Sequence, residues 1–226
     1  ATDQYLARVD WTYLIDGIGI TVQRVDRDQT TIDCGFAAFS KDEPNPQRIT
    51  LETEHAEIQA NWVNLSYDYR SLPSAAEVYT SETSGVRQVY YRQSGHEAAA
   101  ITGDDRVVDG VKTVDEASGT AFVTGFHDTP LENQLYAVSL DGGEPKRSTE
   151  AGKSWSVTVA PDGQTFVGTS SAPNHPPQTG LYQIDGTLST WIEENALDET
   201  HPYAPYLASH TVPEFGTITA EDGQEM

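Results

Sequence analysis

Few residues in this chain could do chemistry, and their spacing does not form a known catalytic motif. Two adjacent carboxylates, Glu193 and Glu194, have the residue types of the acid and base of a glycoside hydrolase. They lie in a stretch of strand-forming residues, and neighbouring side chains on a strand point to opposite faces of the sheet. The two carboxylates therefore cannot act together on one bond, and we expect no acid–base function from them.

A serine nucleophile and a metal centre are not indicated either. The Gly-x-Ser-x-Gly turn of α/β-hydrolases does not occur, and the nearest stretch, residues 168–172, ends in alanine. A single cysteine, Cys34, excludes an intrachain disulfide framework and a thiolate zinc site. The six histidines show no i, i+4 pairing, and Asp26, Asp28 and Asp33 lack calcium-loop spacing. We expect no catalytic residue, metal or cofactor in this chain.

An aromatic and cationic run is the strongest candidate for ligand binding. The segment from Ser66 to Ala76 is longer than a hairpin needs, and loops of excess length often carry binding residues. Trp62, Tyr69 and Arg70 lie in or beside this segment. Packing between structural units explains the same residues, Trp62 above all, so both interpretations stay open.

A repeat of strands must position these residues. Tyr90, Tyr136 and Tyr182 follow one another at intervals of 46 residues, each within a run of β-forming residues that ends in a turn. A second set of aromatic residues repeats independently, at intervals of 43 and 44 residues. A strand-rich repeat of about 40 to 50 residues is typical of β-propeller blades. The sequence therefore predicts an all-β chain, a partial propeller of about four blades with four antiparallel strands each.

The repeat also predicts where the units begin and end. The four blades are predicted to span residues 1–52, 53–104, 105–151 and 152–194. Within the second blade, residues 58–65 are predicted to form the innermost strand. Beyond residue 194 the repeat stops, and two X-Pro steps predict an extended linker over residues 195–209. Residues 211–220 predict one more strand, an orphan without a hairpin partner, so we expect Met226 to be a cut end inside a larger protein.

The charge of the chain limits its partners. Thirty-five Asp and Glu residues against 13 Lys and Arg give a formal net charge of −22, which repels nucleic acid phosphates. The surface is predicted to be a solvated acidic face, with attraction of cationic partners as the alternative. A hydrophobic share of 37% indicates a packed core. The apolar runs are too short for a membrane span, and no secretory leader opens the sequence.

A set of short runs matches one family of enzymes. The runs are Arg8-Val9-Asp10-Trp11, Val22-Gln23-Arg24, Asn61-Trp62-Val63-Asn64-Leu65, Pro145-Lys146-Arg147, residues 191–197 and residues 201–221. They resemble the dipeptidyl peptidase IV family of serine exopeptidases. The resemblance covers nearly the whole chain and is strongest over residues 120–223.

The resemblance implies a place for the chain inside a larger enzyme. In that family an eight-bladed propeller precedes an α/β-hydrolase domain, and the two together remove Xaa-Pro or Xaa-Ala dipeptides from peptide N-termini. The chain resembles the later half of such a propeller, and residues 195–226 would lead to the absent hydrolase domain. The catalytic serine, histidine and aspartate would lie beyond Met226, and the acidic pair that binds the substrate amine would lie before Ala1.

The resemblance also implies candidate site residues and a location. The segment from Trp62 to Arg70 matches a family segment that faces the cavity between propeller and hydrolase. Trp62, Asn64, Tyr69 and Arg70 are therefore the candidate cavity-lining residues. The parent protein would be periplasmic or secreted, with peptides as its substrates.

The sequence leaves three possible functions and one possible assembly to be tested. The chain is predicted to be a non-catalytic propeller segment that walls and gates a peptidase cavity, and to be inactive alone. A stand-alone propeller that binds protein or peptide is the alternative, and a propeller glycosidase finds no support in the repeats. Four blades of an eight-bladed ring leave two open faces, which we expect to be apolar. A homodimer that packs the first blade of one copy on the fourth of the other would cover both faces.

Overall fold

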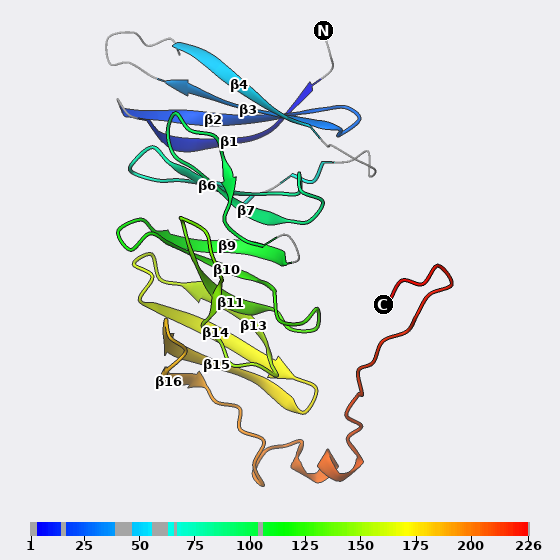
Figure 1. The fold of residues 1–226 in the computed structure, drawn as a ribbon. Helices are drawn as coiled ribbons and strands as arrows, with labels where there is room; N and C mark the ends of the chain where they lie inside the picture. The colour runs from blue at the N-terminus through cyan, green and yellow to red at the C-terminus, as the bar shows by residue number, and fades with distance from the viewer. Residues whose placement is uncertain are drawn as a thin grey trace.

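The chain folds into a row of β-sheets. The computed structural model describes residues 4–14, 17–38, 47–55, 63–65, 67–103 and 106–225, with only the backbone for residues 47–55. Within these residues, sixteen strands form four four-stranded antiparallel sheets. The sheets follow one another from the blue first sheet to the yellow fourth sheet (Figure 1). The chain is a partial β-propeller, as the repeat predicted.

Each sheet consists of four strands that are consecutive in the chain. The first sheet comprises β1 (Gln4–Leu14), β2 (Gly17–Asp26), β3 (Thr31–Ala38) and β4 (Gln47–His55), and the second comprises β5 (Arg70–Ser71), β6 (Glu77–Ser81), β7 (Gln88–Arg92) and β8 (Ala99–Ala100). The third comprises β9 (Val107–Asp115), β10 (Thr120–Phe126), β11 (Gln134–Ser139) and β12 (Lys146–Arg147), and the fourth comprises β13 (Ser154–Val159), β14 (Thr165–Ala172), β15 (His175–Gln183) and β16 (Leu188–Glu193).

Two apolar clusters hold the second, third and fourth sheets together. The first joins the second and third sheets around Val78, Val89 and Val123, each of which is fully buried. The second joins the third and fourth sheets around Leu135 and a group of aromatic rings. Strand β10 contributes to both clusters, which explains why residues 121–125 are buried without alternation.

The first sheet is attached differently. Val25 and Ile32 are buried, but they belong to neither cluster. Thr12 of β1 faces the second sheet, because its hydroxyl group contacts Ser71 of β5. The neighbouring side chains of β1 point the opposite way, and Trp11 is 75% exposed. The outer face of the first sheet is therefore apolar, as the open-ring prediction expected.

The outer face of the fourth sheet is mixed rather than uniformly apolar, because β13 is polar there while Val167 of β14 and Ile192 of β16 are exposed. Along β13, Trp155, Val157 and Val159 are buried against the third sheet, and the residues between them are exposed. Those outward residues are Ser154, Ser156 and Thr158, all with hydroxyl groups. The strict alternation of β13 places polar side chains on whichever face lacks a neighbour. The homodimer stays a prediction, and the two faces that it would cover differ, one apolar and the other mixed.

The innermost strand of the second sheet begins later than predicted. Residues 63–65 are not in a strand, and residues 58–62 lie outside the described part of the chain. The pairing starts only at Arg70, opposite Val78. Before that point side chains rather than the backbone join this segment to the sheet, since Asn64 donates to Glu82 at 2.6 Å. The chain still follows the inner edge of the sheet, but without a backbone ladder.

The segment after the fourth sheet also differs from its prediction. Residues 204–209 form a 3₁₀ helix, η1 (Ala204–Ser209), instead of continuing as an extended linker. Pro205 stands in its first turn, where a missing N–H costs no hydrogen bond. Residues 211–218 form no strand, and only one isolated bridge, between Thr219 and Glu225, occurs there. Without a neighbouring strand, the predicted orphan has no backbone partner to pair with.

One end of the row of sheets recurs as a meeting point of chain segments. We call it the exit face and define it by the turns between the second and third strands of each sheet, residues 27–30, 82–87, 127–133 and 173–174. At this face the segment that enters each next sheet donates a backbone N–H to the preceding turn. These bonds run from Val63 to Gln29 (2.7 Å), from Val108 to Arg87 (3.0 Å) and from Trp155 to Asn133 (2.8 Å).

The C-terminal segment leaves from the same face. Asn195 Nδ2 donates to the backbone oxygen of Pro177 at 3.0 Å, and the His210 ring contacts the backbone oxygen of Pro173 at 2.9 Å. Both contacts lie beside the β14–β15 turn. No helix within the described residues has the length and apolar character to cross a bilayer.

Candidate ligand site on the exit face

The four residues predicted from the sequence do not share one environment. Trp62 lies outside the described residues. Asn64 lies at the exit face, whereas Tyr69 and Arg70 are half-buried between sheets. The three described residues therefore have to be considered separately.

Tyr69 belongs to a chain of hydroxyl groups that joins the first and second sheets. The backbone N–H of Tyr13 donates to Ser71 Oγ at 2.7 Å, and this hydroxyl lies 2.8 Å from Thr12 Oγ1. Thr12 Oγ1 is 3.3 Å from the Tyr69 hydroxyl. The Tyr69 hydroxyl in turn donates to Glu77 Oε1 at 2.5 Å. We call this set, with Arg92, the polar joint.

Glu77 and Arg92 complete the polar joint on the second sheet. They are cross-strand neighbours on β6 and β7, and Arg92 Nε donates to Glu77 Oε2 at 2.8 Å. Burial raises the pKa of Glu77, and the hydrogen bond from Tyr69 opposes this rise. Burial and the adjacent Glu77 carboxylate raise the pKa of Tyr69, so its hydroxyl remains a donor at neutral pH. These partners explain Tyr69 as a structural residue.

Arg70 braces the second sheet against the third. Its Nη1 donates to its neighbour's backbone oxygen, and its Nη2 donates to the backbone oxygen of Val111 at 3.0 Å. Val111 lies in β9, within the apolar cluster between the two sheets. The guanidinium group thus satisfies carbonyl groups where the β5 ladder is short.

Asn64 is the one described candidate that lies beside a cavity. Its Nδ2 donates to Glu82 Oε2, and Glu82 Oε1 pairs with Arg87 Nε at 3.3 Å. Glu82 and Arg87 both lie in the β6–β7 turn, and both line a cavity of about 410 Å³. This volume falls within the usual range for small-ligand sites.

The cavity lies between the second and third sheets at the exit face. Its wall on the third sheet includes Val107 and Asp109 of β9 and Phe126 at the end of β10. Asp109 Oδ2 accepts hydrogen bonds from Thr124 Oγ1 at 3.0 Å and from Asn133 Nδ2 at 3.1 Å. The β10 strand and the β10–β11 loop therefore fix the carboxylate in place.

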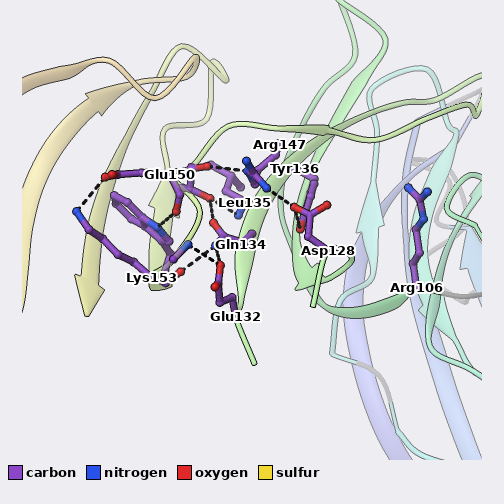
Figure 2. Close-up of polar contacts among 12 residues, drawn as sticks. Arg106, Asp128, Glu132, Gln134, Leu135, Tyr136, Arg147, Glu150 and Lys153 are labelled. Carbon is purple, nitrogen blue, oxygen red and sulfur yellow. Dashed lines mark hydrogen bonds and ion pairs between the residues drawn. The ribbon is translucent and has the colours of Figure 1, made fainter. Parts of the chain in front are cut away.

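The exit face of the third sheet continues as a polar network (Figure 2). Gln134 is fully buried at the start of β11, and its Nε2 donates to Glu132 Oε2 and to the backbone oxygen of Lys153, both at 2.8 Å. Its Oε1 accepts from the hydroxyl of Thr149 at 2.6 Å. Because these contacts link the turn, the outer strand and the next sheet, they hold this part of the face rigid.

A second group in Figure 2 lies nearer the outer strand of the third sheet. Asp128 Oδ2 accepts from Arg147 Nη1 at 2.5 Å and from the Tyr136 hydroxyl at 3.1 Å. Although burial opposes ionisation, the bonds from Arg147 and Tyr136 hold the pKa of Asp128 below its ordinary value. Burial and the Asp128 carboxylate raise the pKa of Tyr136 to about 12. All three groups have partners, so this set is structural.

The fold and the sheet pattern correspond to a known family of propellers. The family model for the dipeptidyl peptidase IV N-terminal region matches residues 1–177 of the 226-residue chain. The chain belongs to this family. The resemblance found in the short sequence runs is thereby confirmed.

A solved structure of the same architecture supports the fold. The chain is similar to dipeptidyl peptidase 4 from Porphyromonas gingivalis, with a TM-score of 0.78 at 18% sequence identity. The match covers 98% of this chain and 30% of that protein. The chain therefore spans less than a third of the length of the protein it matches.

The cavity residues had no distinct signal in the sequence. Asp109 and Glu82 are two of 35 acidic residues, and neither stands in a motif. The buried glutamine of the polar network did have a signal in the sequence. Gln134 has an equivalent in the second sheet, Gln88, which lies 46 residues earlier, and each of the two precedes a repeated tyrosine by two positions. Both glutamines are fully buried beside a threonine that accepts a backbone N–H. The repeat therefore contains polar core positions as well as apolar ones.

Proposed function

We propose that this chain walls the peptide-binding cavity of a dipeptidyl peptidase IV-type serine exopeptidase. The observation that carries the proposal is the family match over residues 1–177. In this proposal the parent enzyme removes Xaa-Pro or Xaa-Ala dipeptides from peptide N-termini. The chemistry belongs to a hydrolase domain outside these 226 residues, and the chain alone is inactive.

The exit face is the part of the chain that suits this role. The C-terminal segment leaves the fourth sheet there, so a following domain would be tethered at this face. The face also carries the cavity beside Asn64 and the rigid network around Gln134. Side chains held by sheet ends and buried hydrogen bonds keep their positions, as a wall that selects peptides by size and charge must do.

The proposal includes a location for the parent enzyme. We infer that it acts in the periplasm or as a secreted protein, as the family resemblance implies. Its peptide substrates would then come from outside the cytoplasm, and its acidic surface would remain solvated there.

An assay of the chain and of its complete reading frame tests the proposal. The purified 226-residue chain and the complete gene product are compared on a Gly-Pro chromogenic substrate. We expect turnover only from the complete protein, and that turnover should be abolished by a serine-directed inhibitor. Turnover by the chain alone that survives repurification would contradict the assignment of roles.

The same gene distinguishes the second candidate, a stand-alone peptide-binding propeller. The cavity on the exit face favours binding under either function. A downstream region of about domain size that contains Gly-x-Ser-x-Gly supports the peptidase. A reading frame without such a region, in a protein that still binds peptides, supports the scaffold.

A further inference from the structure

Two histidines hold the segment that follows the fourth sheet. His201 lies just before η1, the orange helix below the fourth sheet in Figure 1, and His210 caps the end of this helix. Each ring has a partner at both of its nitrogens. A ring nitrogen with a proton donates and one without a proton accepts, so the partners decide which protonation states of the ring fit.

The partners of His201 require a neutral ring. The backbone N–H of Tyr203 can only donate, and it points to His201 Nδ1 at 3.0 Å, so Nδ1 carries no proton. The other nitrogen, Nε2, lies 3.1 Å from Asn195 Oδ1. This amide oxygen is an acceptor, and the amide nitrogen of the same side chain donates to the backbone oxygen of Pro177. His201 is therefore the neutral tautomer with its proton on Nε2.

The partners of His210 fit both protonation states. Its Nε2 lies 2.9 Å from the backbone oxygen of Pro173, which can only accept, so Nε2 carries a proton. Its Nδ1 lies 2.9 Å from the Tyr203 hydroxyl, which can donate to a neutral ring or accept from a charged one. Protonation therefore breaks a hydrogen bond at His201, whereas at His210 it only reverses the direction of one.

Two carboxylates belong to the surroundings of His201. Glu193, at the end of β16, accepts from the backbone N–H of Asn195 at 3.1 Å, and Asp198 accepts from the N–H and the hydroxyl of Thr200 at 2.8 and 2.7 Å. The bonds from Thr200 hold the pKa of Asp198 below its ordinary value, and the charge of His201 contributes. The Asp198 carboxylate therefore stays ionised while a histidine titrates. The contacts on the β14–β15 side are with backbone oxygens, which do not titrate.

We propose that His201 is a pH-sensitive switch for the start of η1. Histidine is the side chain that ordinarily changes charge between about pH 5 and 8. When His201 Nδ1 gains a proton, it becomes a donor that faces the Tyr203 N–H, which is also a donor, and the bond between them is lost. Tyr203 is the N-cap of η1 and makes no side-chain cap of its own, so the start of the helix loosens in acid. The contacts of His210 persist, and the end of the helix stays attached.

The switch is a property of the chain itself. In the proposed enzyme the same segment leads to the hydrolase domain, so acid would loosen the tether between the two domains. This consequence rests on the proposed function, whereas the switch rests on the hydrogen bonds of His201.

Nuclear magnetic resonance of the full 226-residue chain tests the switch. A hydrogen bond between two nitrogens gives a measurable scalar coupling, so the bond from the Tyr203 amide to His201 Nδ1 can be observed directly. We expect the coupling at about pH 8 and its loss at about pH 5, together with a fall in the heteronuclear NOE of the Tyr203 amide. A coupling that persists in acid, or one that is absent at both values of pH, would overturn the inference.

The ring itself provides a second measurement. Nitrogen chemical shifts distinguish the two neutral tautomers of histidine and the charged ring. At about pH 8, the shifts of His201 should report a proton on Nε2 and none on Nδ1. A proton on Nδ1 at this pH would contradict the proposed start of the switch.

Matched variants assign the effect to His201. His201→Asn places an amide oxygen near the position of Nδ1, where it accepts the Tyr203 N–H in an Asx turn at any pH. This variant should keep the heteronuclear NOE of Tyr203 unchanged between base and acid. His210→Gln keeps a donor for the backbone oxygen of Pro173 and should retain the acid response of the unchanged chain. An acid response in His201→Asn, or its loss in His210→Gln, would overturn the assignment.

The switch and the proposed function fail separately. The measurements use the chain without any hydrolase domain, with the thermal unfolding temperature as the check on folding, so loss of dipeptidase activity in the complete protein leaves their outcomes unchanged. Conversely, an active complete enzyme whose propeller chain keeps the Tyr203 coupling in acid overturns the switch alone.

Discussion

Two joints between neighbouring sheets differ in the kind of contact that holds them. The joint between the third and fourth sheets is aromatic, whereas the joint between the first and second sheets is polar. In the former, three rings of the fourth sheet pack together, with Tyr182 stacked on Phe166 at 5.1 Å between centroids and edge-on to Trp155 at 5.3 Å. These rings form one apolar cluster with Phe122 and Leu135 of the third sheet. In the latter, the contacts are the hydrogen bonds of Thr12 and Tyr13 with Ser71 and Tyr69, and the Glu77–Arg92 pair supports Tyr69 from within the second sheet. No apolar cluster of the described residues spans the two sheets.

The two kinds of contact should respond differently to small movements between sheets. Burial of apolar surface is not directional, so the aromatic joint tolerates small shifts between sheets. A chain of hydroxyl groups is directional, and each member depends on the next. The first sheet should therefore separate from the second sheet more easily than the fourth sheet separates from the third.

Removal of the central ring of the aromatic joint should have the largest effect. Trp155 is 5% exposed, and its Nε1 also donates to the backbone oxygen of Glu150 at 3.0 Å. Trp155→Ala should lower the free energy of unfolding by about 3–5 kcal/mol, as for other large-to-small changes in a core. Trp11→Ala, at a ring that is 75% exposed, is the matched control. If urea unfolding gave equal losses of unfolding free energy for the two variants, the result would contradict the stabilising role of the aromatic joint.

Loss of one hydroxyl group from the polar joint should have an intermediate effect. Tyr69→Phe removes the donor to Glu77 and the link to Thr12 while it keeps the ring. The expected loss is about 1–2 kcal/mol, because Glu77 is left with one donor fewer. Tyr67→Phe, at a ring that is 68% exposed, should change stability little. The same urea titration measures both, and a neutral Tyr69→Phe variant would show that the polar joint carries no stability.

The pH dependence of stability should report on Glu77. Its pKa is raised by burial, so the native state takes up a proton at a pH where the unfolded chain has released it. The Glu77 contribution to the free energy of unfolding is therefore greatest below the ordinary carboxyl pKa and is lost as the pH rises through the raised value. Glu77→Gln should remove this slope, and Glu199→Gln, at an exposed site, should retain it. Identical pH profiles for Glu77→Gln and the unchanged chain would contradict the burial of this carboxylate.

The smallest effect is expected at the acidic pair that ends the fourth sheet. Glu193 lies in β16 and Glu194 follows it, and both side chains are exposed. The double variant Glu193→Gln, Glu194→Gln should change stability by less than about 0.5 kcal/mol. In the complete enzyme it should leave the Michaelis constant for peptides unchanged. If the Michaelis constant rose as much as it does when the amine-binding pair is removed, the amine-binding function would lie in this blade instead.

The same contrast explains what could be predicted from the sequence. Strand positions repeat along the chain, so the 46-residue interval predicted the blades, and two of its three tyrosines, Tyr136 and Tyr182, are buried while Tyr90 is half-buried. The polar joint brings together residues 57 to 59 positions apart, such as Thr12 with Tyr69 and Ser71. No periodic pattern connects such residues, since each bond depends on how two sheets meet.

The candidate site was predictable only in part. The excess length of the loop before β6 pointed to Tyr69 and Arg70, and the family resemblance pointed to Asn64, but neither signal says which of these residues lies beside a cavity. Asp109 lies in a strand whose sequence is typical of core, and its place at the exit-face end of that strand follows from the packing of two sheets. The orphan strand failed for a related reason, because residues 211–220 have strand-forming side chains but no neighbour to pair with.

Native-state hydrogen exchange of the chain tests the contrast between the two joints most directly. Amides of β2 and β3 report on the first sheet, and amides of β10 and β14 report on the sheets united by apolar clusters. The account predicts that β2 and β3 exchange through an opening of lower free energy, while β10 and β14 exchange only with global unfolding. Equal protection of all four strands, with the same dependence on denaturant, would show that the polar joint holds as firmly as the aromatic one and would contradict the account.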